Sequence, residues 1–440
     1  MSSEKKNLYR TAAGRKFVAR NSLLTDIFQK SENANVYHIV LLILSHFFIA
    51  TGLNQYTHNK RVDFGFGLIL KNFYNFDKAV QIWLYCFMST CAAFLCFTVW
   101  ANFRNFSREY KIYWDWLWTL LLILYYYWSF KITGRAIKDS TFKLPLGIFL
   151  AMETVRFLMK VHSFVRNNVS RVIAQENCKR LFPKFSNFLY FLFAPTLIYK
   201  DAYPTKKKIN WKFLGFLLFE SGCIMLMFSY VADTVNSHIQ DYGLRKFTVT
   251  ELVVAIAQNI VRVGTLTMLS IFAFYLHCLQ NIFAELTGFE DRFFYSDWWN
   301  DSNPKAWLRK WNPIVEEWLY FYVYMEFKTH VCNNTFLTKI VTISLSFVVH
   351  DWLLTALVGS FCPFMFLGIL ILMFPLSCFS LPKHKFVVVW NWLVMSFGWN
   401  LVIFVYSLEY HTQMNAPVKN LTFLQTLMPK FMLSDCLSLE

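Results

Sequence analysis

Residues 79–100 read AVQIWLYCFMSTCAAFLCFTVW and hold 22 consecutive positions without a charged side chain. A helix of roughly 20 apolar residues crosses the ~30 Å of hydrocarbon in a bilayer, so this stretch predicts a transmembrane helix. A strand of a membrane barrel would instead alternate in hydrophobicity over about ten residues. Comparable apolar windows lie near residues 36–54, 112–131, 143–159, 211–232, 249–276, 336–358, 362–379 and 386–408. The sequence therefore predicts an all-α fold, a polytopic bundle of about nine transmembrane helices.

The composition agrees with a membrane protein. Of the 440 residues, 56% are hydrophobic and 16% are charged, whereas soluble domains average about 25% charged residues. The first 35 residues are polar and basic and lack the short apolar core of a cleavable signal peptide, so we expect the first span to act as a signal anchor. We predict a basic N-terminal tail at 1–35, one membrane domain at 36–410 and a C-terminal tail at 411–440.

Lysine and arginine collect in the N-terminal tail and in the connection 160–210, which includes Lys206-Lys207-Lys208. The positive-inside rule makes both stretches cytosolic, and nine spans then place the C-terminus in the lumen. These flanks account for much of the formal net charge of +16. Contact with the lipid bilayer and its anionic headgroups explains them, so we expect no nucleic-acid partner.

A tryptophan-rich segment, Phe294-Tyr295-Ser296-Asp297-Trp298-Trp299-Asn300, precedes Trp311-Asn312. Aromatic rings of this kind gather at membrane interfaces, which is one interpretation. The polar residues Asp297, Asn300, Arg309 and Asn312 favour another, because amide and guanidinium donors bind phosphates or a developing oxyanion. From these residues alone, an interfacial belt and a binding site are both possible.

His350 lies about two thirds of the way along the window 336–358. An apolar setting favours the neutral imidazole, which is the form that a general base needs, and such a base contributes about 100- to 10,000-fold in rate. The alternative is a structural histidine held by a neighbouring helix, as the adjacent Asp351 suggests. We expect structural roles for His162 and His277. No paired cysteine spacing typical of a metal site occurs.

Three segments together resemble one enzyme family. FYSDWWN at 294–300 matches the FYxDWWN signature of the acyl-CoA:sterol and acyl-CoA:diacylglycerol acyltransferases, a branch of the membrane-bound O-acyltransferase family. RFLMKVHSFVRN at 156–167 resembles the RFxMKxHSFVREN segment of sterol O-acyltransferases, and YFLFAPTLIYKD at 190–201 resembles their YFLFAPTLIYRD. These two segments favour the sterol enzymes. The resemblance runs from about residue 20 to 430.

The resemblance implies a catalytic role for His350 and Asn312, and a role for the signature residues Phe294, Tyr295, Asp297, Trp298, Trp299 and Asn300. It implies that Arg309 and Trp311 lie near acyl-CoA, and that Tyr320, Tyr324, Ser346 and Ser407 line the reaction chamber. The implied activity is transfer of a long-chain acyl group from acyl-CoA, the co-substrate, to the 3-hydroxyl of a sterol. It needs no bound cofactor and no metal. Two alternatives remain, a diacylglycerol O-acyltransferase and a non-catalytic lipid-binding or transport protein.

The family resemblance also implies an endoplasmic reticulum membrane protein. Its N-terminal tail is short for a tetramer assembled through that segment, so we expect a homodimer. Three positions depart from the family pattern. Asp351 stands where a glutamate is usual, Glu316 where sterol enzymes carry a histidine, and Ala416 where a cysteine begins the CPxKN segment. The last change leaves Cys436 without an obvious disulfide partner.

Overall fold

The computed structural model describes residues 14–29, 73–104, 109–140, 142, 144–174, 182–359, 362–363, 384–418, 421–426, 428–433 and 437–438, with single positions between 35 and 67. Within these residues the protein is built almost entirely of helices, which confirms the predicted all-α membrane class. A short parallel pair of strands, β1 (Phe247–Thr248) and β2 (Leu437–Ser438), joins the C-terminal end to the chain before α10.

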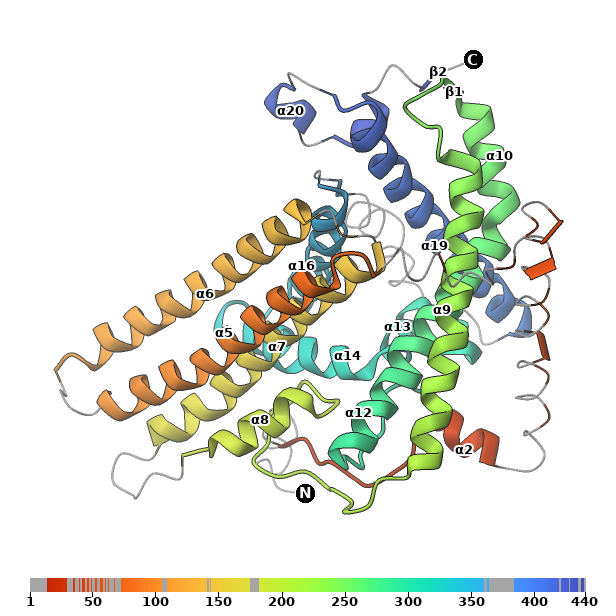
Figure 1. The fold of residues 1–440 in the computed structure, drawn as a ribbon. Helices are drawn as coiled ribbons and strands as arrows, with labels where there is room; N and C mark the ends of the chain where they lie inside the picture. The colour runs from red at the N-terminus through yellow and green to blue at the C-terminus, as the bar shows by residue number, and fades with distance from the viewer. Residues whose placement is uncertain are drawn as a thin grey trace.

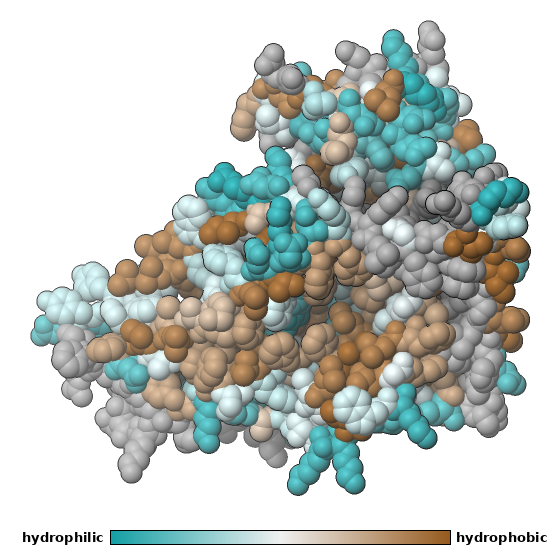
Figure 2. All heavy atoms as spheres, viewed as in Figure 1, coloured by the Kyte–Doolittle hydropathy of each residue, from teal (hydrophilic) through white to brown (hydrophobic). Residues whose placement is uncertain are grey.

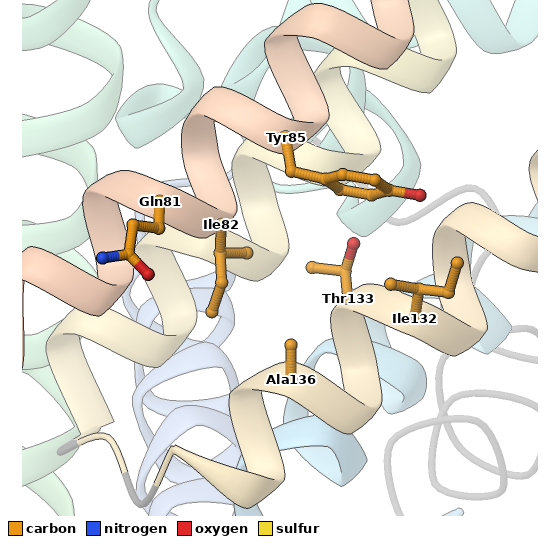
Figure 3. Close-up of a pocket in the computed structure, with 6 residues that line it drawn as sticks. All are labelled: Gln81, Ile82, Tyr85, Ile132, Thr133 and Ala136. Carbon is orange, nitrogen blue, oxygen red and sulfur yellow. The ribbon is translucent and has the colours of Figure 1, made fainter.

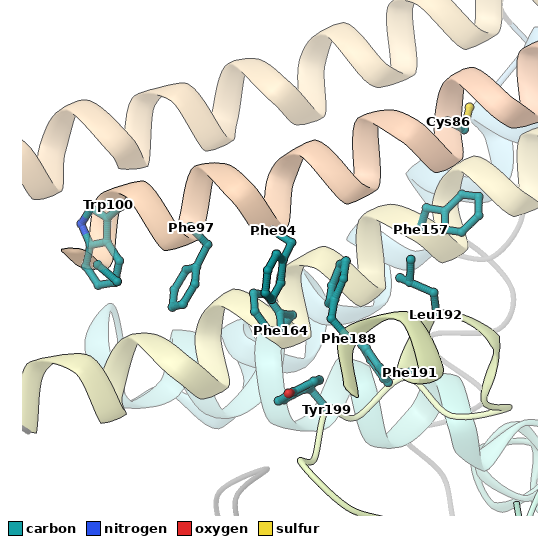
Figure 4. Packing of buried hydrophobic residues seen from close by; sticks show 11 residues of the cluster. Cys86, Phe94, Phe97, Trp100, Phe157, Phe164, Phe188, Phe191, Leu192 and Tyr199 are labelled. Carbon is teal, nitrogen blue, oxygen red and sulfur yellow. The ribbon is translucent and has the colours of Figure 1, made fainter. Parts of the chain in front are cut away.

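Three long helices pack side by side in the left half of Figure 1: α5 (Phe76–Phe103), α6 (Lys111–Asp139) and α7 (Leu144–Ala174). Aromatic side chains fill the space between α5, α7 and the short helix α8 (Phe185–Phe193), as Figure 4 shows. Phe164 of α7 lies within 5.5 Å of Phe94 and within 4.7 Å of Phe188, measured between ring centroids. Burial of such rings is a large favourable term wherever helices meet.

Helix α7 is longer than the predicted span 143–159, because it continues to Ala174 through Arg156 and Lys160. The ammonium group of Lys160 is buried and donates to the carbonyl groups of Phe191, Leu192 and Ala194 at the end of α8. Because its ammonium group is hydrogen-bonded, Lys160 can lie inside the helix. Lys160, which directly follows the predicted span 143–159, therefore links α7 to α8.

The right half of Figure 1 holds a second group of helices. It contains α9 (Trp211–Ile239), α10 (Val249–Asn259) and its continuation η2 (Ile260–Thr265), α11 (Leu266–Ile271), η3 (Phe272–Leu279) and α12 (Gln280–Thr287), together with α19 (Lys385–Asn415). The segments η2 and η3 are π-helical turns, which are frequent at functional sites. Helix α16 (Thr335–Val358) contacts α6 and α7 on one side and α19 on the other, so it connects the two groups.

The connection 277–335 contains short helices. After the turn η4 (Trp298–Asn300), the chain forms α13 (Pro304–Trp311), α14 (Pro313–Leu319), η5 (Tyr320–Tyr324) and α15 (Met325–His330). Both α13 and α14 begin with an asparagine cap followed by proline, a strong signal for a helix start. The remaining short helices are α2 (Leu23–Gln29), α20 (Phe423–Thr426) and η7 (Lys430–Met432).

Five helical stretches among the described residues are long and apolar enough to cross a membrane: α5, α9, Arg262–Thr287, α16 and α19. Four of them match predicted windows, the fifth, Arg262–Thr287, overlaps the window 249–276 in part, and two further windows fall in α6 and α7. The windows 36–54 and 362–379 lie almost entirely outside the described residues, so the count of nine stays a prediction. Figure 2 shows hydrophobic residues over the middle of one face, with hydrophilic residues gathered at its top and along its lower edge.

Candidate functional site

The aromatic residues of the signature segment are buried inside the protein. The side chains of Phe294, Tyr295 and Trp298 are each about 1% exposed. The ring of Phe272, on η3, meets Tyr295 and Trp298 in T-shaped contacts with centroid distances of 4.8 and 5.0 Å. This burial disagrees with an interfacial belt, because a belt residue keeps one edge of its ring in the headgroup region.

Tyr295 ties the signature segment to the bundle and to the N-terminal segment. Its hydroxyl is hydrogen-bonded to Nδ1 of His277 at 2.6 Å and accepts a hydrogen bond from the backbone N–H of Leu24. Burial raises the pKa of this hydroxyl, so it stays neutral. The histidine therefore has the structural contact that its sequence context suggested.

Asp297 and Asn300 differ in their environment. The carboxylate of Asp297 lies 2.8 Å from Nζ of Lys310, which also pairs with Asp301 at 2.9 Å. Desolvation acts to raise the pKa of Asp297, but the hydrogen bond and charge of Lys310 outweigh it and the pKa is lowered. This ion pair holds η4 against α13, whereas the Asn300 side chain is exposed.

Asn312 lies between α13 and α14, as the C-cap of the first helix and the N-cap of the second. Its side-chain Oδ1 accepts a hydrogen bond of 3.2 Å from the backbone N–H of Val315. Because an N–H can only donate, this bond fixes which end of the amide is the oxygen. The Nδ2 group makes no hydrogen bond with any residue that the structure describes, so it is free to donate to a bound molecule.

The neighbours of Asn312 form two further contacts. The ring of Trp311 stacks on Trp307 with a centroid distance of 4.8 Å. The guanidinium group of Arg309 lies 3.7 Å from the carboxylate of Glu316, and its side chain is 59% exposed. Burial raises the pKa of Glu316, Arg309 acts to lower it, and the net direction is upward.

His350 is exposed on α16. Its Nδ1 lies 2.7 Å from the backbone carbonyl of Ser346, one turn earlier in α16. A carbonyl can only accept, so Nδ1 carries the proton in the neutral ring and Nε2 keeps its lone pair. The adjacent Asp351 does not hold the ring: it is buried and receives a hydrogen bond from Tyr406 of α19.

The other predicted site residues lie on neighbouring elements. Tyr320 and Tyr324 stack in η5, with ring centroids 5.7 Å apart, and η5 packs against α16. Ser407 is half-buried on α19. Within the described part of the chain, no hydrogen bond or ring contact joins His350 directly to Asn312; their helices are connected through η5.

The N-terminal segment reaches the site, which the sequence analysis missed. Arg20 pairs with the buried Asp291 at 2.6 Å, and Arg15 pairs with Glu317 of α14 at 2.8 Å. Both arginines stand among several others in a basic stretch, so no local signal separates the paired ones. Only tertiary packing determines which arginines form these ion pairs.

A cavity of about 190 Å³ lies between α5 and α6, lined by Gln81, Ile82, Tyr85, Ile132, Thr133 and Ala136 (Figure 3). None of the predicted site residues lines it, so it is separate from the candidate site. Among the residues with a described position, no group of three His, Cys, Asp or Glu side chains could hold a metal ion. The expected absence of a metal therefore stays a prediction.

Comparison with known proteins places the chain among membrane acyltransferases. The model of the membrane-bound O-acyltransferase family matches residues 69–409. Sterol O-acyltransferase 1 of Rattus norvegicus is 30% identical over 427 residues, which cover 95% of this chain and 78% of the relative. The Mus musculus protein of the same name is 29% identical with the same coverage. Sterol O-acyltransferase 2 of Homo sapiens is 26% identical and covers 94% of this chain and 79% of the relative.

Proposed function

Because the chain belongs to the membrane-bound O-acyltransferase family, in its sterol O-acyltransferase branch, we propose that it transfers a long-chain acyl group from acyl-CoA to the 3-hydroxyl of a sterol. The match over residues 69–409 includes every residue proposed for the site. The relatives named sterol O-acyltransferases align with nearly the whole chain. Their names support a sterol acceptor.

The contact between Nδ1 of His350 and the Ser346 carbonyl carries the mechanism. It leaves the Nε2 lone pair able to take the proton of the sterol hydroxyl as the sterol oxygen attacks the thioester carbonyl carbon. The new C–O bond forms, the C–S bond breaks, and the imidazolium returns its proton to the leaving thiolate. The products are a steryl ester and coenzyme A. General-base help of this kind contributes about 100- to 10,000-fold in rate.

Asn312 has the complementary role in this proposal. Its Oδ1 is held by the backbone of α14, so its Nδ2 group is preorganised to donate to the oxyanion that develops on the thioester oxygen. The exposed guanidinium of Arg309 suits the phosphates of coenzyme A, and Trp311 supports the same region. We assign Tyr320, Tyr324, Ser346 and Ser407 to the walls that receive the two substrates.

The proposal also covers the membrane, the orientation and the oligomeric state of the protein. The protein is a multi-pass membrane protein, and we place it in the endoplasmic reticulum with its N-terminus in the cytosol and its C-terminus in the lumen. Acyl-CoA enters from the cytosol and the sterol from the bilayer. A homodimer is the assembly that we propose, with no resident metal or cofactor.

The acceptor is tested by supplying the purified, reconstituted protein with labelled oleoyl-CoA and either a sterol or diacylglycerol. We expect a labelled steryl ester and no labelled triacylglycerol. Triacylglycerol alone would assign the protein to the diacylglycerol enzymes. The absence of any labelled ester from a folded preparation would leave only a lipid-binding or transport role.

The base is tested with His350→Ala. We expect ester formation to fall by about 100- to 10,000-fold at an unchanged elution volume in size-exclusion chromatography. His330→Ala is the matched control, because that histidine is also exposed and its one ion pair among the described residues is with Glu326 on its own helix. Full activity of folded His350→Ala would remove His350 from the mechanism.

A further inference from the structure

A buried pair links the helix of His350 to α19. Asp351 is 4% exposed and Tyr406 is 5% exposed. The Tyr406 hydroxyl donates to Oδ1 of Asp351 at 2.6 Å and also lies 2.8 Å from the carbonyl oxygen of Cys362. A carboxylate in an apolar helix is costly unless it is hydrogen-bonded, so this bond strongly favours one arrangement of the two helices.

Three consecutive residues of α16 make contacts in three different directions. Asp351 bonds to Tyr406 of α19. Trp352 contacts α6, where its ring meets Phe130 in a T-shaped contact at 4.6 Å. Among the described residues, no hydrogen bond or ring contact joins His350 to α6 or α19, and its Nδ1 lies against a carbonyl of its own helix. Successive residues of a helix point about 100° apart, so the contacts of Asp351 and Trp352 fix the direction in which His350 points.

The hydrogen bond between Tyr406 and Asp351 also fixes the position of α19 along α16. Tyr406 precedes Ser407, which we assign to the wall of the substrate chamber, and Asp351 follows His350. One hydrogen bond between neighbours of these two residues therefore fixes the position of the base relative to that wall. Reacting atoms must be held closely, because a displacement of about 1 Å lowers a rate by around 100-fold.

We propose that Asp351 and Tyr406 are positioning residues, which aim His350 at the acceptor hydroxyl by locking the rotation and register of α16 against α19. The inference rests on the proposed function, since it assigns the pair a role only in that reaction. The carboxylate of Asp351 reaches the Tyr406 hydroxyl with helix α16 in its present position.

Tyr406→Phe is the first test, because it removes one oxygen atom and keeps the ring. We expect kcat to fall by about 10- to 100-fold while KM for acyl-CoA and for sterol changes less than twofold, since the pair orients the base and touches neither substrate. Tyr410→Phe is the matched control: it removes a hydroxyl one turn later on α19, and that hydroxyl has no hydrogen bond in the described structure. We expect this control to keep the wild-type kcat.

A set of variants at Asp351 separates positioning from a general effect on folding. Asp351→Asn keeps an oxygen that accepts from Tyr406, so we expect kcat within about threefold of wild type. Asp351→Leu removes it and should also lower kcat. The double variant Asp351→Leu with Tyr406→Phe should be no slower than Tyr406→Phe alone, because the Asp351–Tyr406 bond is already broken in that single variant.

Two results would overturn the proposal: a wild-type kcat in Tyr406→Phe, or losses that simply multiply in the double variant. If Tyr406→Phe does not fold, Asp351→Asn still tests the proposal, because its kcat must then stay near wild type while Asp351→Leu loses it. The proposed function fails in a different way, through a wild-type protein that forms no steryl ester or a His350→Ala variant that retains full activity.

Discussion

At the residue scale, Asn312 combines a structural and a chemical role in one amide. Its Oδ1 caps α14 and its Nδ2 group is left to donate. Asn312→Asp keeps an acceptor for the cap but loses the donor, whereas Asn312→Ala loses both. We expect both variants to lose at least 100-fold in kcat, as removal of an oxyanion donor typically does. Only Asn312→Ala should lose stability, by about 1 kcal/mol.

The measurements are steady-state kinetics and thermal unfolding of the same preparations. An active Asn312→Asp would show that the amide N–H donor is not used. Equal stability of the alanine and aspartate variants would show that the cap contributes little.

Glu316 and its neighbour Glu317 predict opposite effects of a glutamine substitution on stability at pH 7. Burial raises the pKa of Glu316 from its ordinary value of 4.5, so the folded protein binds that proton more tightly than the unfolded chain does. Its stability therefore increases as pH falls from the folded pKa towards 4.5, and ionisation destabilises the fold at neutral pH. We expect Glu316→Gln to raise Tm at pH 7 and to match wild type below about pH 4.5.

Glu317 is the control, because its carboxylate is ion-paired with Arg15 at 2.8 Å. We expect Glu317→Gln to lower Tm at pH 7, since it removes a charged partner from a partly buried arginine. The check is Tm between pH 4 and pH 7.5 for both variants and wild type. A lower Tm for Glu316→Gln at pH 7 would contradict the upward direction of its pKa.

The sequence could predict which residues to consider here, but not how each one is used. The motif around residues 294–312 pointed to the site, yet Asp297 pairs with a lysine and Trp298 fills the core. The sequence left open whether Asp351 holds His350, whereas in the structure Asp351 faces α19, because adjacent helical residues point in different directions. Local patterns do not reveal which residues from distant segments meet.

At the element scale, η2 packs closely against α19. A Cβ atom added to Gly264 would lie 1.9 Å from the backbone oxygen of Ser396, and Thr265 bonds to the Ser396 hydroxyl at 2.7 Å. Gly264→Ala must therefore push α19 away, and we expect a loss of about 3 kcal/mol or more of stability. Thermal unfolding in detergent measures this change.

Gly398 provides the matched control on α19 itself. No atom lies within 4 Å of a Cβ built there, and alanine favours a helix by about 1 kcal/mol over glycine. We expect Gly398→Ala to be neutral or stabilising. If both glycine variants had the same Tm, tight packing at Gly264 would not matter for the fold.

At the scale of the whole molecule, the fold class followed from hydrophobic length alone. The windows at 79–100, 211–232 and 336–358 each coincide with one apolar helix. The window 249–276 is less simple, because its helix contains the π-turns η2 and η3 and continues to Thr287. Hydropathy measures how long an apolar stretch is. It does not report backbone irregularities or an N-terminal segment that packs back onto the bundle.

The side of the membrane on which the C-terminus lies depends on the number of transmembrane crossings. Between Lys207 and Met414 lie four candidate spans, α9, the stretch that ends at Thr287, α16 and α19, and the sequence predicts a fifth over 362–379. Five crossings would put these two exposed residues on opposite sides, and the positive-inside rule predicts the cytosolic side for the lysines. We expect Lys207→Cys to react with an impermeant maleimide in sealed microsomes and Met414→Cys to react only after detergent is added.

The wild-type chain, with its ten cysteines, gives the background labelling. Labelling of both variants in sealed microsomes would mean four crossings, and the segment 362–379 would then not span the membrane.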